Sequence, residues 1–185
     1  MSTNAIVPGS LAAVANRDGL SLAESFLNCE ILVVIDQSGS MWAKDVSGGR
    51  TRLGAAETEL SRIQKQNPGK VGVISFSSTV EFSPGGLPNR EGGSTNMAGA
   101  LNFVHVADGA CQIVLISDGE PDNESTALVA ARRFANPIHT IYIGPESGEG
   151  RQFLERLAAM TGGRSFQRVE ASLLAGGVEQ LLLNA

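Results

Sequence analysis

The sequence is poor in cysteine, histidine and tryptophan. It has two cysteines, two histidines and one tryptophan in 185 residues. Two cysteines cannot build a disulfide framework. His105 and His139 have no second His and no Cys at ligand spacing, so neither fits the nitrogen and sulfur sites that zinc prefers. We therefore expect both histidines to be structural.

Long apolar runs and an excess of positive charge are also missing. No stretch approaches the ~18 apolar residues that a membrane span requires. The first eight residues show no basic region followed by an apolar run, so they do not resemble a secretory signal. The net charge of -5 disfavours a nucleic-acid partner. We expect one soluble, cytoplasmic domain that binds neither nucleic acid nor membranes, with its small Arg50/Arg52 and Arg132-Arg133 clusters solvated.

One short apolar run ends in oxygen-bearing side chains. Residues 31–35 are apolar and mostly β-branched, which is typical of a strand buried on both faces of a parallel sheet. Asp36, Ser38 and Ser40 follow at a spacing of two. Ligands of open α/β sheets bind beyond the carboxyl ends of the strands. Carboxylate and hydroxyl oxygens suit Mg²⁺ or Mn²⁺ better than zinc.

Strands alternate with helices along the rest of the chain. Further strands are predicted at residues 71–76, 79–82, 113–117, 138–143 and 164–167, and helices at 52–66, 97–104, 123–136, 150–161 and 171–183. The short Ser77-Ser78 link predicts an antiparallel edge hairpin. The fold class is therefore α/β, with a mostly parallel central sheet, one short antiparallel edge strand and helices on both faces.

The first 27 residues are predicted to form an N-terminal arm outside this domain. The arm should be loose to about residue 20, because it is polar, small and marked by Pro-Gly and Asp-Gly turns. Residues 21–27 can form one short helix, with Ser21 as N-cap and Glu24 in the capping-box position. The domain itself should span residues 28–185.

The Asp-x-Ser-x-Ser pattern resembles the first segment of the metal-ion-dependent adhesion site of von Willebrand factor A domains. The second segment of that family resembles residues 92–96, and the third resembles residues 113–121, in the same order. The resemblance covers about residues 29–183 and implies a Rossmann-like three-layer sandwich. It also implies a divalent ion, Mg²⁺ or else Mn²⁺ or Ca²⁺, whose ligands would be Asp36, Ser38, Ser40, Thr95 and Asp118.

The resemblance implies a protein-binding module and not an enzyme. Only two of the five ligands are charged, so the ion would keep positive charge and an open position for a partner's Glu or Asp carboxylate. Stand-alone intracellular members often work beside AAA+ ATPases or in stress-response systems, which is an analogy for this chain. Two alternatives remain: a metal-dependent hydrolase or phosphatase using Asp36, and a structural subunit with an idle metal site. Ser38 stands where such a phosphatase needs a second Asp.

Other side chains near the motif carry weaker expectations. Trp42 is either a core residue or, beside a metal loop, an exposed anchor for a partner. Glu120 and Asp122 are expected to be solvated, although they would add negative field near the ion. Lys44 and Asp45 are expected to be ordinary loop charges.

The two cysteines stand in equivalent positions relative to the two aspartates. Cys29 lies seven residues before Asp36, and Cys111 lies seven before Asp118. If both aspartates flank one ion, their strands are neighbours in matching register. The two thiols should then lie side by side at the opposite end of the sheet. In a reducing cytosol we expect them to be free and structural.

Overall fold

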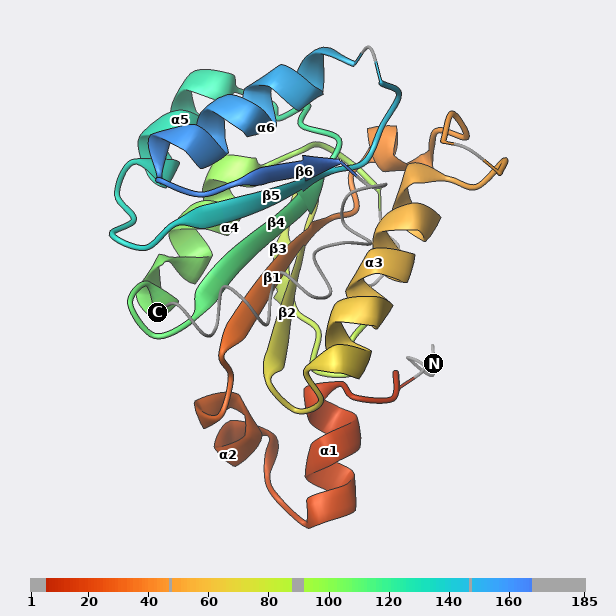
Figure 1. The fold of residues 1–185 in the computed structure, drawn as a ribbon, viewed down its shortest axis with the longest axis vertical. Helices are drawn as coiled ribbons and strands as arrows, with labels where there is room; N and C mark the ends of the chain where they lie inside the picture. The colour runs from red at the N-terminus through yellow and green to blue at the C-terminus, as the bar shows by residue number, and fades with distance from the viewer. Residues whose placement is uncertain (1–5, 47, 88–91, 147, 168–185) are drawn as a thin grey trace.

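A central six-stranded sheet organises the chain (Figure 1). The structure, a computed structural model, describes residues 6–46, 48–87, 92–146 and 148–167. The strands follow the spatial order β3-β2-β1-β4-β5-β6. Only β3 runs antiparallel to its neighbour, at the sheet edge. Their bounds are β1 Ile31–Asp36, β2 Val71–Phe76, β3 Val80–Phe82, β4 Gln112–Ser117, β5 Ile138–Tyr142 and β6 Ser165–Gln167. The predicted α/β architecture is confirmed.

Helices cover both faces of the sheet (Figure 1). On one face lies α3 (Arg52–Gln66), and on the other lie α4 (Met97–Val104), α5 (Glu124–Ala131) and α6 (Glu149–Met160). Successive residues of a strand point to opposite faces, so β1 contributes to two apolar cores. Residues 31, 33 and 35 pack in the core under α3, while residues 32 and 34 pack in the core that contains α4, α5 and α6 residues. This double burial fixes β1 at the centre.

The N-terminal segment is more ordered than the sequence indicated. The expected loose arm is wrong, because a helix α1 spans Leu11–Asp18. The Ser10 side chain caps it by accepting a hydrogen bond from the Ala13 N–H. Leu11 is buried, and the Ala12 N–H donates to the Pro84 carbonyl in the loop after β3. The segment is therefore packed onto the domain.

The second N-terminal helix agrees with the prediction. Helix α2 spans Leu22–Leu27, and Ser21 and Glu24 form the predicted capping box. Helix α5 is shorter than predicted, because the N–H groups of Ala135 and Asn136 donate to the Asp108 carboxylate instead of continuing the helix. The final helix predicted at residues 171–183 lies outside the described residues. Within the described part of the chain, no helix has the length and apolar character needed to cross a membrane.

The register between β1 and β4 differs from the prediction by one residue. Ile31 lies opposite Gln112, and Ile35 lies opposite Ile116. Continuing this register, Asp36 is level with Ser117 and not with Asp118. The cysteines still meet at the amino ends of the two strands. Both are buried and free, and the Cys111 thiol donates to the Cys29 carbonyl oxygen at 3.3 Å.

Candidate metal centre

The loop after β1 brings three oxygen-bearing side chains together. Asp36 is fully buried. One of its carboxylate oxygens accepts from the Ser38 N–H at 2.8 Å, and the other accepts from the Ser117 hydroxyl at 2.6 Å. A short 3₁₀ helix, η1 (Gly39–Trp42), then turns the chain so that the hydroxyls of Ser38 and Ser40 lie 3.1 Å apart. Two of the predicted ligands are thus in direct contact.

Backbone hydrogen bonds tie the second loop to the first and third. The Gly39 N–H donates to the Gly93 carbonyl at 2.9 Å. The Thr95 N–H donates to the Asp122 carboxylate at 2.7 Å, and the Asp122 N–H returns a bond to the Thr95 carbonyl at 3.0 Å. Among the residues that the structure describes, the Thr95 hydroxyl makes no hydrogen bond, so it is available as a ligand. Asp122 is exposed, as predicted, and its carboxylate has the additional role of fixing Thr95.

The fifth predicted ligand, Asp118, is paired with an arginine that the sequence did not connect to the site. The Asp118 side chain is fully buried, and one of its oxygens accepts from Arg52 Nη1 at 2.8 Å. Arg52 opens α3 and is 10% exposed. It also pairs with Asp45 at 2.6 Å and with Glu120 at 3.3 Å. The solvated surface predicted for Arg52 is wrong, because Arg52 is buried. Asp45 and Glu120 are exposed as predicted, and both also pair with Arg52.

The first turn of α3 packs beside the ends of the strands, which brings Arg52 next to Asp118. The hydrogen bonding that Arg52 donates to Asp45 is the main cause of the raised pKa of the Arg52 guanidinium, and it also lowers the pKa of the Asp45 carboxyl. Asp45 and Asp118 lie 7 and 66 residues from Arg52 in the chain. Because Arg52 and Asp118 are far apart in the chain, no local sequence pattern predicts that they form an ion pair.

The electrostatics of the two buried aspartates favour a cation between the loops. Burial, followed by the nearby charge of Asp118, raises the pKa of Asp36 to about 6. An external cation would relieve that repulsion. Among the described residues, no three His, Cys, Asp or Glu side chains cluster as a metal site, so hydroxyls must complete the ligand set. The five residues fit Mg²⁺, which accepts a few protein oxygens and keeps several waters.

The other residues considered from the sequence have clear positions. Trp42 is 43% exposed at the end of η1, beside the site, which agrees with the surface alternative. His105 contacts the Arg133 carbonyl through Nε2 at 3.1 Å. His139 Nδ1 accepts from the Arg164 N–H at 3.2 Å. Both histidines therefore have structural partners.

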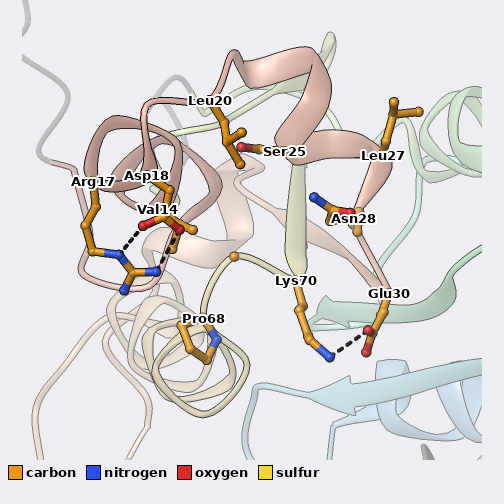
Figure 2. Close-up of a pocket in the computed structure, with 12 residues that line it drawn as sticks. Val14, Arg17, Asp18, Leu20, Ser25, Leu27, Asn28, Glu30, Pro68 and Lys70 are labelled. Carbon is orange, nitrogen blue, oxygen red and sulfur yellow. Dashed lines mark hydrogen bonds and ion pairs between the residues drawn. The ribbon is translucent and has the colours of Figure 1, made fainter.

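A cavity opens at the opposite end of the sheet, between α1, α2 and the turn before β2 (Figure 2). Its volume is about 520 Å³. Two ion pairs, Arg17–Asp18 and Lys70–Glu30, lie on different sides of it (Figure 2). Because β1 leads away from this end toward Asp36, the cavity is separate from the candidate metal centre.

Comparison with known proteins supports the predicted resemblance. Residues 31–120 match the model of the von Willebrand factor type A domain. This match includes the candidate ligands Asp36, Ser38, Ser40, Thr95 and Asp118. This part of the chain is therefore similar to a von Willebrand factor type A domain.

The curated relatives that this chain matches are distant. Calcium-activated chloride channel regulator 3A-1 of Mus musculus is 29% identical over 159 residues, which cover 74% of this chain and 17% of the mouse protein. The chain therefore corresponds to under a fifth of that relative's length.

Solved structures resemble this one in fold. An aerotolerance-related membrane protein from Bacteroides fragilis has a TM-score of 0.65 at 16% identity, covering 85% of this chain and 100% of that one. The ArnB paralog VWA2 from Sulfolobus acidocaldarius has a TM-score of 0.56 at 22% identity, covering 80% and 43%. At these identities the similarity establishes the fold alone.

Proposed function

We propose that this chain is a von Willebrand factor type A domain that serves as a cation-dependent protein-binding module. In this proposal a Mg²⁺ ion, or else Mn²⁺ or Ca²⁺, is held by Asp36, Ser38, Ser40, Thr95 and Asp118. The observation that carries the proposal is the joining of three separate loops by hydrogen bonds, which brings all five oxygen-bearing side chains to one end of the sheet. Similarity to a family known for protein–protein interaction, metal-dependent in some members, supports it.

The ligand set explains how a partner would be captured. The bound ion would supply an open coordination position for a Glu or Asp carboxylate of the partner. Two carboxylates and three neutral hydroxyls leave a divalent ion under-neutralised once the Asp118 charge is shared with Arg52. The exposed Trp42 adds an apolar anchor beside the site. An AAA+ or stress-response partner and a cytoplasmic location remain part of the proposal by analogy.

Titration calorimetry with Mg²⁺ tests the proposed site. Asp36→Ala and Thr95→Ala should abolish binding or weaken it strongly while the far-UV spectrum stays native. Lys65→Ala serves as the control, because Lys65 lies in the last turn of α3 and should not affect binding. A capture experiment with and without EDTA then identifies partners that are released on chelation. Equal Mg²⁺ binding by Asp36→Ala would show that the ligand assignment is wrong.

The structure also bears on the hydrolase alternative. A nucleophilic carboxylate needs access to its substrate, but Asp36 is fully buried and both its oxygens already accept hydrogen bonds. We therefore propose binding and not catalysis. Turnover of a generic phosphate ester that disappears in Asp36→Ala would favour the phosphatase. A native protein that binds no divalent ion would favour the structural subunit.

A further inference from the structure

We propose that Arg52 is a resident counter-cation of the metal centre, which opposes ion binding, and that Asp45 in the neighbouring loop tunes this opposition. This inference rests on the proposed function, because it concerns the affinity of the same site. It assigns a regulatory role to a guanidinium that is not itself a ligand.

The geometry sets Arg52 between the site and the loop. Its Nη1 donates to the buried Asp118 carboxylate at 2.8 Å and lies 3.3 Å from Glu120. The other edge of the guanidinium, Nε and Nη2, donates to Asp45 at 3.0 and 2.6 Å. Arg52 is thus held by two edges, one facing the ion ligand and one facing the loop between η1 and α3.

Burial makes this pairing consequential. A fully buried carboxylate without a partner is strongly unfavourable, so Arg52 offsets the charge of Asp118 when no ion is present. The same guanidinium places a positive charge within one hydrogen bond of a predicted cation ligand. Positive charges so close repel each other, and screening is weak at a site where Arg52 is only 10% exposed. Arg52 should therefore lower the affinity for Mg²⁺.

Asp45 shares the Arg52 guanidinium with Asp118. Its side chain is 36% exposed and accepts all three hydrogen bonds on the second edge of Arg52. Because the negative charge of Asp45 offsets part of the guanidinium charge, it weakens the hold of Arg52 on Asp118 and its repulsion of an ion. Removing the charge of Asp45 should strengthen the pairing of Arg52 with Asp118 and lower the affinity of the site for the ion. A partner that moves this loop would change ion affinity through the same contact.

Mg²⁺ titration of variants without any partner tests the inference. Arg52→Met should bind Mg²⁺ about tenfold more tightly than the native chain, a difference of ~1.4 kcal/mol. In EDTA it should unfold at a lower temperature, and Mg²⁺ should raise that temperature more than in the native chain. Asp45→Asn should bind Mg²⁺ several-fold more weakly. Arg62→Met, which removes another arginine of α3, should match the native affinity.

The double variant separates a contact through Arg52 from a general charge effect. In the Arg52→Met background, Asp45→Asn should change Mg²⁺ affinity less than about twofold, because the side chain through which Asp45 acts is gone. An undiminished effect there, or Mg²⁺ affinity in Arg52→Met equal to or below that of the native chain, would overturn the role of Arg52. If Arg52→Met does not fold, Asp45→Asn still tests the inference. Mg²⁺ affinity in Asp45→Asn equal to or above that of the native chain would contradict it. Absence of Mg²⁺ binding in both the native chain and Arg52→Met would instead refute the proposed function itself.

Discussion

At the scale of single residues, Asp36 is a buried carboxylate whose ionisation depends on its surroundings. Burial and the charge of Asp118 raise its pKa to about 6, from 3.8 in the unfolded chain. A raised carboxyl pKa favours the folded state while the group is protonated. This contribution is complete below about pH 4 and is lost as the pH rises through about 6.

In EDTA, the native chain should therefore lose about 2 to 3 kcal/mol of its free energy of unfolding from this group between pH 4 and 7. Asp36→Asn cannot ionise, so it should lack that component. Urea unfolding of both proteins at several pH values measures the difference. Parallel pH profiles for the two proteins would show that folding does not raise the pKa of Asp36.

Asp122 is the residue that positions the Thr95 loop. Its carboxylate accepts from the Thr95 N–H, and its own N–H donates to the Thr95 carbonyl. Asp122→Ala should weaken Mg²⁺ binding about tenfold, or ~1.4 kcal/mol, because the Thr95 N–H loses its acceptor. Asp122→Asn keeps an acceptor oxygen and should retain most of the affinity. Calorimetry distinguishes this positioning role from a long-range charge effect, which both variants would share.

The candidate ligands and their supports differ in how far the sequence predicts them. Asp36 and Asp118 directly follow buried apolar runs, so their place at the strand ends could be predicted from local pattern. Asp122 and Arg52 could not be assigned in this way. Their partners come from other elements, and only the packing of α3 and the second loop against the strand ends brings them together.

At the scale of elements, β4 and α6 approach each other closely just beyond Asp118. Gly119 has a φ of +73°, and a Cβ there would collide with the Gly150 carbonyl in the first turn of α6. Gly119→Ala should cost about 3 kcal/mol or more of unfolding free energy and displace Asp118. Gly162 has a similar φ of +76° but open space around it.

Gly162→Ala is therefore the matched control. It should lower the free energy of unfolding by only ~1 kcal/mol, because it introduces an unfavourable backbone conformation without a collision. Chemical unfolding compares the two. Equal losses would mean that the backbone angle alone matters and that the contact between β4 and α6 can relax.

Strand and helix positions were predictable where burial and periodicity agree. The bounds of β2 and α3 match the predictions, because an unbroken buried run and a regular apolar face each identify one element. Helix α1 was missed, although Ser10 is a suitable N-cap and Gly19 ends the helix in the left-handed conformation. The small side chains of that segment and the turn signals on either side of it hid its two buried positions, Leu11 and Ala15. The one-residue shift between β1 and β4 depends on pairing between distant strands, which spacing alone does not fix.

At the scale of the whole molecule, the N-terminal segment is part of the folded unit. Leu11 is 1% exposed, so Leu11→Ala should lower the free energy of unfolding by about 2 to 4 kcal/mol through lost burial and a residual cavity. Leu27 is 84% exposed, and Leu27→Ala should change it by less than about 0.5 kcal/mol. Urea unfolding measures both. Indifference to Leu11→Ala would restore the original expectation of a loose arm.

The hydrogen bonds that join the three loops also have a kinetic consequence. The hydrogen bonds Gly39–Gly93 and Thr95–Asp122 hold the described parts of the loops together through the chain's own groups, so little ordering of these residues is left for the moment of encounter. Binding to such a surface loses little conformational entropy. Its association rate should be set by diffusion and orientation, about 10⁵ to 10⁷ M⁻¹s⁻¹, without a slow unimolecular phase. The single tryptophan, exposed beside these loops, would make that encounter visible by stopped-flow fluorescence.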